Sequence, residues 1–192
     1  MSEFIQGLDK KSLRKFFISR RNDYFDEYSI KNNSHIHLRP ITESSSPCVV
    51  GSYLPFKNEV PTNFIHKELR KLDCEICLPC INSEDSSMIF RKFESNNKLV
   101  ANKYGILEPS KDSYKSKPSI LIVPLVAFSH EGYRLGYGGG YYDRFIKANM
   151  DSKDFVTIGL GFSFQKYDLL PFEEHDQKLN WILTEKYLYK VK

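Results

Sequence analysis

A glycine-rich segment that follows an arginine and precedes an aspartate is the stretch of this sequence best suited to chemistry. Four of the five residues from 136 to 140, here called the glycine loop, are glycines, which let backbone N–H groups approach an anion closely. Arg134 stands just before this loop and Asp143 just after it. The apolar periodicity from Tyr141 to Ala148 predicts a helix, whose N-terminus would favour negative charge. These features together predict a phosphate-binding site.

The residues themselves leave the phosphate ligand open. The loop lies some distance after an apolar, β-branched run, Ile120–Val123, which predicts a strand buried on both faces. A dinucleotide fingerprint would place G-x-G-x-x-G directly after the first strand, and a P-loop would end in Gly-Lys-Ser/Thr. Neither pattern is present here, so the loop belongs to a different class of phosphate site.

A basic segment near the start of the chain predicts the first helix, from about Leu8 to Arg21, with its apolar residues on one face. Lys10 and Arg14 are four residues apart, so they project from one side of this helix, one turn from each other. The basic face is either simply solvated or an arm that binds nucleic acid, and the helix alone leaves both interpretations open.

The remaining pattern alternates strands with helices and predicts an α/β fold, a single layered domain with a mainly parallel sheet flanked by helices. No clear element is expected between residues 22 and 46, apart from one short helix, and residues 96–116 read as irregular. Ligands bind such sheets at the carboxyl ends of the strands, where Glu59, the glycine loop and the segment after Phe162 would gather. The other expected elements are strands at Val49–Leu54, Cys74–Cys80, Ser87–Phe93, Phe155–Phe162 and Trp181–Thr184, and a helix that begins at Pro61 or Thr62.

Length and composition fit one soluble domain that spans residues 1–192. The hydrophobic content of 41% and the charged content of 27% are ordinary, and a net charge of +4 suits anionic small ligands as well as nucleic acid. No apolar run approaches the roughly 18 residues that span a bilayer. The N-terminus carries no apolar signal core, so we expect a cytoplasmic protein without a membrane partner.

The four cysteines are Cys48, Cys74, Cys77 and Cys80. The last three suggest a metal site, but a spacing of three along a strand places Cys74 and Cys77 on opposite faces. Cys48 is remote in sequence, and no histidine stands at zinc-finger spacing. We therefore expect free thiols in a reducing compartment.

The segment Arg134–Arg144, with Pro124, Ala127 and Phe128 before it, closely resembles the 5-formyltetrahydrofolate cyclo-ligase family, also called 5,10-methenyltetrahydrofolate synthetases. Further points of resemblance occur in family order and span nearly the whole chain: Lys10, Ser12, Leu13 and Arg14 near the start, Leu54, Glu59 and Thr62 in the middle, and Glu174, His175 and Asp176 near the end. The resemblance implies an ATP-dependent, Mg²⁺-requiring ring closure of 5-formyltetrahydrofolate to 5,10-methenyltetrahydrofolate. It also implies that ADP and phosphate are released, after a phosphoryl group activates the formyl oxygen.

The same resemblance implies roles for individual residues. Arg134 and Tyr142 are the implied catalytic residues, and Asp143 and Asp176 the implied Mg²⁺ ligands, since hard oxygen ligands suit that ion. ATP is implied to contact Lys10, Lys11, Ser12, Leu13 and Arg14 in the first helix, and Arg134, Leu135, Gly136, Tyr137, Gly138, Gly139, Gly140, Tyr141 and Tyr142 in the loop region. The folate is implied to contact Leu54, Glu59, Tyr137, Gly138, Gly139, Gly140 and Tyr141.

The chain departs from the family pattern at Ser129, where the family usually has Asp, and also at Pro61 and in the region from Tyr28 to Ser46. The hydroxyl of Ser129 accepts a hydrogen bond but carries no charge, which leaves a non-catalytic folate- or nucleotide-binding relative as an alternative. A nucleic-acid-binding module that uses the basic helix is a second alternative, but it leaves the glycine loop unexplained. We expect ATP and 5-formyltetrahydrofolate as partners and no nucleic acid, and the sequence leaves a monomer and a homodimer equally open.

Overall fold

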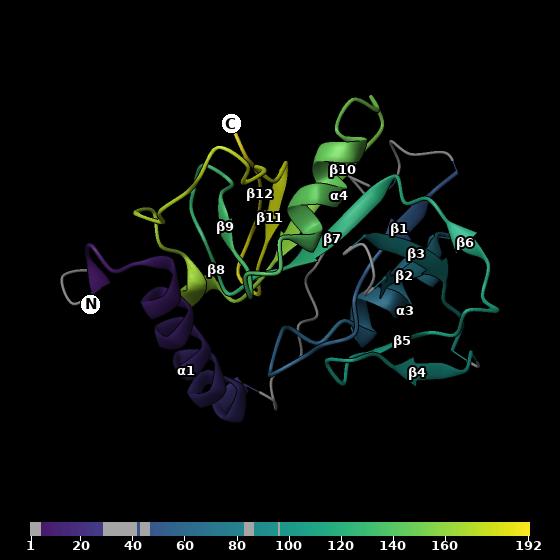
Figure 1. Ribbon diagram of the computed structural model, residues 1–192, viewed down its shortest axis with the longest axis horizontal. Helices are drawn as coiled ribbons and strands as arrows, with labels where there is room; N and C mark the ends of the chain where they lie inside the picture. The colour runs from purple at the N-terminus through teal and green to yellow at the C-terminus, as the bar shows by residue number, and fades with distance from the viewer. Residues whose placement is uncertain (1–4, 29–41, 43–46, 83–86, 96) are drawn as a thin grey trace.

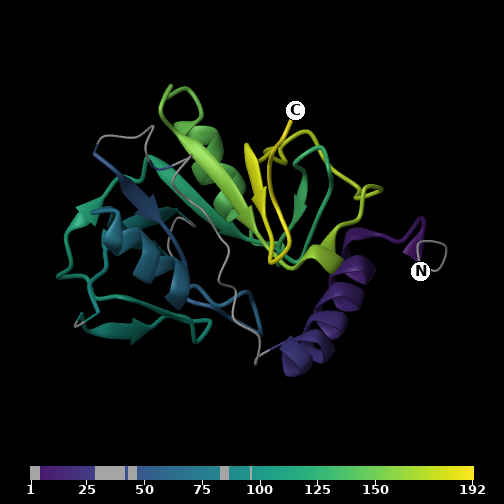
Figure 2. The ribbon, with the colours of Figure 1, turned by 180° about the vertical axis from the view of Figure 1, so that it is seen from behind.

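The computed structural model describes residues 5–28, 42, 47–82, 87–95 and 97–192, and its centre is an eight-stranded sheet (Figure 1). The strand order is β12-β11-β10-β7-β1-β2-β3-β6, and Figure 2 shows the same sheet from behind. The four pairings from β11 to β2 are parallel, and the three at the two edges are antiparallel, so the predicted mainly parallel α/β sheet is confirmed. The strands are β1 (Val49–Gly51), β2 (Glu75–Ile81), β3 (Met88–Lys92), β6 (Lys115–Ser116), β7 (Ile120–Pro124), β10 (Val156–Leu160), β11 (Trp181–Leu183) and β12 (Leu188–Lys190).

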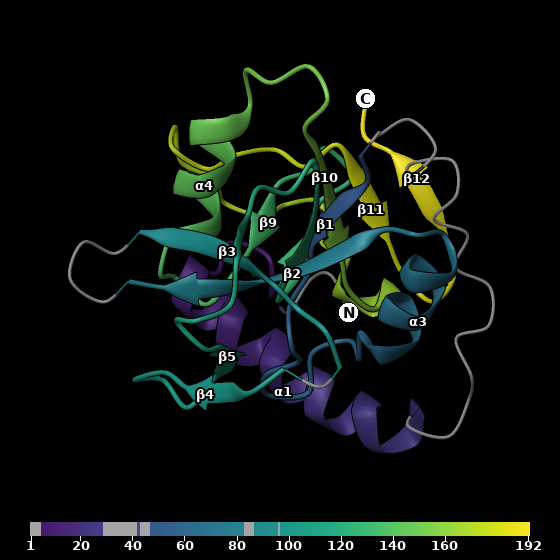
Figure 3. The same cartoon turned by 90° about the vertical axis from the view of Figure 1, so that its right-hand side faces the viewer.

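Helices cover both faces of this sheet, as Figure 3 shows for α3 (Asn63–Lys71) and α4 (Tyr141–Asn149). Strand β7 packs against the apolar clusters on both faces of the sheet, because successive side chains of a strand point to opposite faces. Ile120 and Ile122 pack in the cluster that contains residues of α3, while Leu121 and Val123 pack in the cluster that contains Ile146 of α4. The continuous apolar run at 120–123 therefore reads as a strand buried on both sides, as predicted.

The first helix, α1 (Lys10–Tyr28), lies at the end of the sheet where the glycine loop is found. Leu13 and Phe17 pack with Leu135 and Tyr167 in a third apolar cluster. The helix continues beyond its predicted end at Arg21. The predicted short helix between residues 22 and 46 falls mostly outside the described residues.

Short strands account for most elements that the sequence did not predict. A two-stranded hairpin, β8 (Ala127–Phe128) and β9 (Arg134–Leu135), stands between β7 and the glycine loop. A second pair, β4 (Leu99–Ala101) and β5 (Leu107–Pro109), and strand β6 lie in the stretch expected to be irregular. Segments of two or three residues are too short to carry an alternating pattern. None of the helices in the described part of the chain is both long and apolar enough to cross a membrane.

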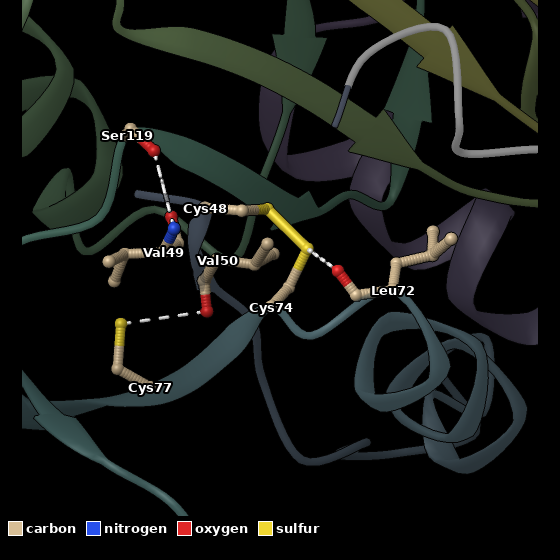
Figure 4. The surroundings of a disulfide bond; sticks show 7 residues. All are labelled: Cys48, Val49, Val50, Leu72, Cys74, Cys77 and Ser119. Carbon is tan, nitrogen blue, oxygen red and sulfur yellow. Dashed lines mark hydrogen bonds between the residues drawn. A yellow bond between two sulfur atoms is a disulfide. The ribbon is translucent and has the colours of Figure 1, made fainter. Parts of the chain in front are cut away.

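Two of the cysteines form a disulfide, Cys48–Cys74, with a Cα–Cα distance of 4.8 Å (Figure 4). The prediction of free thiols is wrong for this pair, and it holds for the buried Cys77 and Cys80. Cys48 directly precedes β1 and Cys74 directly precedes β2, and these strands pair in parallel from Val49 and Glu75 onward. The register of the sheet therefore brings together two residues that are 26 apart in sequence. The predicted separation of Cys74 and Cys77 onto opposite faces is confirmed by their membership of different apolar clusters.

Reducing this disulfide is expected to lower the free energy of unfolding by about 3 kcal/mol, because the bond restricts the unfolded chain between residues 26 apart. Urea unfolding with and without a dithiol reductant measures the effect, and the double variant Cys48→Ser/Cys74→Ser should not respond to reductant. Thiol titration in denaturant should count two thiols before reduction and four after it. Four thiols before reduction would contradict the disulfide.

Candidate active site

Arg134 of β9 is held in place by an ion pair and a backbone contact. Its side chain is only 4% exposed, and its Nη2 donates to Oδ1 of Asp143 at 2.7 Å. Its Nη1 donates to the carbonyl of Gln177 at 2.7 Å, and the N–H of Gln177 donates to the same Oδ1 of Asp143 at 3.0 Å. Burial lowers the pKa of Arg134, and the charge of Asp143 offsets part of this effect. The arginine therefore joins the start of the loop segment, the first turn of α4 and the segment around residue 177.

Lys10 at the start of α1 makes a second ion pair beside the first. Its Nζ donates to Oδ2 of Asp176 at 2.7 Å and lies 2.8 Å from Oε1 of Glu173. Partial burial opposes the charged form of Lys10, but the two carboxylates outweigh it and raise the pKa of Lys10. Burial acts to raise the pKa of Asp176, but the hydrogen bond and charge of Lys10, together with the backbone hydrogen bond at Glu173, outweigh it and lower that pKa. Lys10 and Asp176, which are 166 positions apart, thus meet next to Arg134. The charges of both Asp143 and Asp176 act to raise the pKa of Arg134.

The glycine loop lies between these pairs and contacts α1. Arg14 donates from Nε to the carbonyl of Gly136 at 2.7 Å, and a Cβ built on Gly138 would lie 3.4 Å from Nη2 of Arg14. Gly138 and Gly140 have φ values of 97° and 65°, a region that other residues rarely adopt. Gly140 is the N-cap of α4, and no side chain caps this helix. The N-terminus of α4, the end of a helix that favours negative charge, therefore lies directly after the glycine loop, where the sequence predicted a helix to begin.

Glu59 lies in the turn after β1 and is 5% exposed. Its Oε2 accepts a hydrogen bond from the N–H of Phe56 at 2.9 Å. Burial raises the pKa of Glu59 to about 7, against smaller lowering effects of the Phe56 N–H and of Arg21. At neutral pH this carboxyl is therefore close to half protonated. The charge of Glu59 also acts on the hydroxyls of Tyr53, Tyr137 and Tyr142, which places the turn next to the glycine loop and α4.

The two tyrosines that begin α4 have different surroundings. Burial raises the pKa of Tyr142 strongly, and the charge of Glu59 adds to this effect while Arg134 opposes it. The hydroxyl of Tyr142 is therefore neutral at physiological pH and can donate a hydrogen bond. The hydroxyl of Tyr141 lies 3.1 Å from that of Tyr104, and Arg144 stands over the Tyr141 ring.

The remaining predicted site residues lie in ordinary structural positions. Lys11 and Ser12 are exposed on the first turn of α1, where the N–H of Ser12 donates to the Asp9 carboxylate. Leu13 and Leu135 are buried in the apolar cluster under the loop, and Leu54 is half-buried beside Tyr53. Roles for these residues in ligand binding stay predictions.

Ser129, at the position where the family resemblance led us to expect Asp, is buried in the turn between β8 and β9. Its Oγ accepts a hydrogen bond from the N–H of Tyr133 at 3.2 Å, and its carbonyl accepts one from Gly132 at 3.1 Å. The side chain therefore stabilises the hairpin that carries Arg134, which requires an acceptor but no charge.

Arg21 belongs to the same region, and the sequence did not single it out. It is 1% exposed and donates hydrogen bonds to the carbonyl of Lys57 and to the hydroxyl of Tyr137. The sequence spacing indicates which face of α1 carries Arg21. Lys10 and Arg21 are eleven residues apart, so they lie three turns apart on one face of the helix. Lys10, Arg14 and Arg21 all face the glycine loop and its surroundings, so these parts of the basic face are not free for nucleic acid.

Two surface hollows of about 290 and 330 Å³ lie elsewhere, along β3 and its neighbours. Lys92 and Glu94 line both, and none of the predicted site residues lines either one. We therefore define the candidate site by its contacts and charges.

Comparison with known proteins gives a consistent result. Residues 6–185 match the model of the 5-formyltetrahydrofolate cyclo-ligase family. This chain belongs to that family. A 5-formyltetrahydrofolate cyclo-ligase of Haemophilus influenzae is 30% identical over 153 residues, which cover 77% of this chain and 81% of that protein. One of Mycoplasma pneumoniae is 28% identical over 93% of this chain and its own full length.

Solved structures in the same family share the fold. The 5,10-methenyltetrahydrofolate synthetase of Mycoplasma pneumoniae superposes with a TM-score of 0.65 at 25% identity, and covers 93% of this chain and 99% of its own. The Aquifex aeolicus 5,10-methenyltetrahydrofolate synthetase gives a TM-score of 0.67 at 28% identity, over 95% of this chain and 93% of its own. The resemblance stated from the sequence motifs is therefore confirmed, and the non-catalytic and nucleic-acid-binding alternatives are not favoured.

Glu59→Gln is expected to flatten the dependence of stability on pH. Between its ordinary value of 4.5 and its raised pKa of about 7, Glu59 holds a proton in the folded protein that the unfolded chain has released. Its stabilising contribution is therefore complete below pH 4.5 and is lost as the pH rises through about 7. A shift of this size corresponds to about 3 kcal/mol.

Urea unfolding of wild type and Glu59→Gln at pH 5, 6, 7 and 8 measures this difference. The variant should gain relative stability with each step upward, while the contribution of His66, whose pKa burial lowers to about 4, is common to both proteins. Glu131→Gln, at an exposed turn, is the matched control and should follow wild type. Parallel curves for Glu59→Gln and wild type would show that Glu59 has an ordinary pKa.

Proposed function

We propose that this protein catalyses the ATP-dependent cyclisation of 5-formyltetrahydrofolate to 5,10-methenyltetrahydrofolate, with release of ADP and phosphate. The observation that carries the proposal is the arrangement of two ion pairs, Arg134–Asp143 and Lys10–Asp176, around a glycine loop at the N-terminus of α4. Cations and a helix N-terminus beside carboxylates suit a nucleoside triphosphate and its metal ion. Membership of the cyclo-ligase family supports the choice of folate as second substrate.

In the proposed reaction, the formyl oxygen attacks the γ-phosphorus of ATP, and the bond from that phosphorus to the leaving oxygen of ADP breaks. The formyl carbon then carries a phosphate, which is a far better leaving group than an amide oxygen. N10 of the folate attacks this carbon, the carbon–oxygen bond breaks, the N10 proton is lost, and phosphate departs. Catalysis of such a transfer consists mainly of positioning and charge neutralisation.

The chain supplies cations for the phosphates from two directions. Arg134 lies before the loop, and Lys10 and Arg14 approach from α1, so the three side chains would surround a triphosphate that rests on the N–H groups of the loop. Left-handed backbone at Gly138 and Gly140 excludes larger side chains from the place where the phosphates would lie. The neutral hydroxyl of Tyr142 would donate a hydrogen bond to the transferring group.

The carboxylates fit Mg²⁺, which usually takes one or two protein carboxylates and completes its shell with phosphate oxygens and water. Asp143 uses Oδ1 for Arg134 and Gln177, and Asp176 uses Oδ2 for Lys10 and the N–H of Glu173. Each residue therefore keeps its other oxygen out of these hydrogen bonds. In the described part of the chain, three or more His, Cys, Asp or Glu residues nowhere form a group that could hold a metal ion by themselves, and Asp143 and Asp176 are the proposed ligands beside the phosphates. The bound ion would neutralise charge on the phosphates.

The folate would lie on the other side of the loop, between the turn that carries Glu59 and residues 137–141. Glu59 has a pKa near neutral pH, so both protonation states are available. The protonated carboxyl can donate a hydrogen bond to the ring system of the folate, and the ionised carboxylate can accept one from it. The loop would then touch both substrates, as direct transfer between them requires. A single domain over residues 1–192 and a cytoplasmic location also remain parts of this proposal, and the oligomeric state stays open.

An absorbance assay for methenyl-folate tests the proposed function. Absorbance should rise only when ATP, Mg²⁺ and 5-formyltetrahydrofolate are all present, with one ADP released for each methenyl-folate formed. Purified, folded protein that binds these compounds without turnover would contradict the proposal.

Asp143→Asn is expected to reduce turnover by roughly 100-fold or more and to raise the Mg²⁺ concentration needed for half-maximal rate, because it removes a charge from the phosphate site. The variant also weakens the ion pair of the buried Arg134, so some loss of stability accompanies the change. Assays well below the melting temperature separate the two effects, and Asp151→Asn, at an exposed turn after α4, is the matched control. A loss of activity that merely follows the unfolded fraction, with an unchanged Mg²⁺ requirement, would mark Asp143 as structural.

A further inference from the structure

We propose that Arg21 is a positioning residue that ties the glycine loop to the turn carrying Glu59, and so fixes the folate side of the site relative to the ATP side. The inference rests on the proposed function, because it concerns how the two proposed substrate sites are held together. Arg21 would contact neither substrate and would act through Tyr137 and the backbone of the turn.

The contacts of Arg21 join three separate segments. Its Nη2 donates to the carbonyl of Lys57 at 2.6 Å and to the hydroxyl of Tyr137. Its Nη1 donates to the carbonyl of Leu125, directly after β7, at 3.4 Å. One buried guanidinium, three turns after the start of α1, therefore connects the Glu59 turn, the glycine loop and the carboxyl end of a central strand.

Tyr137 is the only side chain of the loop between Gly136 and Gly140, and it bridges the two walls of the site. Its ring packs at 5.9 Å from the ring of Phe56, and Nζ of Lys57 stands 5.8 Å from its centroid. The residue is 41% exposed, so the hydroxyl is anchored in the protein while part of the side chain faces outward. Removing the anchor would free both the aromatic contact and the four glycines around it, whose backbone is intrinsically permissive.

The turn on the other side also needs a fixed partner. Lys57 and Asn58 have φ values of 49° and 59°, a left-handed conformation that costs free energy for residues other than glycine. The carbonyl of Lys57 is the group that Arg21 holds at 2.6 Å, and Glu59 follows two residues later. Arg21 therefore stabilises the backbone conformation that directs Glu59 towards Tyr142 and the loop.

The chemistry of arginine fits this role better than that of lysine. The planar guanidinium presents donors in fixed directions, so Nη1 and Nη2 can serve different segments at once, whereas an ammonium is a single point of attachment. Among the described residues the Nε of Arg21 has no hydrogen-bond partner, and Glu59 is the acidic residue whose charge interacts with this arginine. A buried cation whose donors are incompletely paired lowers the stability of the folded protein. Its presence here is therefore better explained by a role in the site than by a contribution to stability.

Arg21→Lys, Tyr137→Phe and the double variant test this coupling. Tyr137→Phe removes one hydroxyl and should leave the melting temperature within about 2 °C, because the residue is partly exposed and the ring contact with Phe56 is kept. Both single variants should raise the KM for 5-formyltetrahydrofolate and lower kcat, with kcat/KM for the folate falling roughly tenfold or more, because a small misplacement of substrate costs rate steeply. The KM for ATP should change less, since Lys10, Arg14 and Arg134 are untouched.

The double variant gives the decisive comparison. If Arg21 acts through the Tyr137 hydroxyl, the second substitution adds little, and the double variant resembles the worse single variant. Arg20→Lys, the same substitution at the neighbouring helix position, is the control and should match wild type. Additive losses, or an unchanged KM for the folate in Tyr137→Phe, would overturn the inference even if Arg21→Lys does not fold.

Hydrogen exchange supplies a reading that does not depend on turnover. In the ligand-free protein, Tyr137→Phe should accelerate exchange at residues 136–141 and 56–59 together, and leave the amides of β7 and β10 unchanged. Unchanged exchange in both segments would overturn the inference, whereas a wild-type protein without cyclo-ligase turnover would overturn the proposed function and leave this test intact.

Discussion

The buried positive charge of Arg134 is the constraint on which the rest of the site depends. A guanidinium that is 4% exposed must find a carboxylate and further acceptors, or the folded state loses several kcal/mol. Asp143 and the carbonyl of Gln177 meet that need, and in doing so they fix β9, the start of α4 and the segment that carries Asp176. The glycine loop is therefore a permissive stretch between fixed ends, which is what a close approach to phosphate requires.

The helix α1 completes the site from the opposite end of the chain. Its basic residues lie at three levels along one face: Lys10 meets Asp176, Arg14 meets the carbonyl of Gly136, and Arg21 meets the turn before Glu59. The helix packs against the hairpin through Leu13 and Phe17, so its apolar face sets the distance at which these cations reach the loop. The packing of α1 thus determines where its positive charges lie. Membership of the cyclo-ligase family supports ATP and 5-formyltetrahydrofolate as the substrates that bind among them.

The parts of the fold that the sequence predicted are those with long, regular patterns. Helix α4 and strands β7 and β10 follow directly from periodicity and β-branched residues, and the motif around the loop located Arg134 and Asp143. The hairpin β8–β9 and strand β12 are two or three residues long and carry no readable period. The disulfide depends on the register of parallel strands, and the buried position of Arg21 depends on three tertiary contacts. Cysteine spacing along one strand does not show the pairing of Cys48 with Cys74. The spacing of Arg21 from Lys10 indicates its face of the helix but not its burial.

The central claim is that the site transfers a phosphoryl group from ATP to the formyl oxygen before ring closure. The most direct measurement uses 5-formyltetrahydrofolate labelled with ¹⁸O in the formyl group, with the phosphate product analysed by ³¹P NMR for the isotope shift. The proposed mechanism predicts one labelled oxygen in each phosphate released. Phosphate without the label, formed together with methenyl-folate, would contradict it.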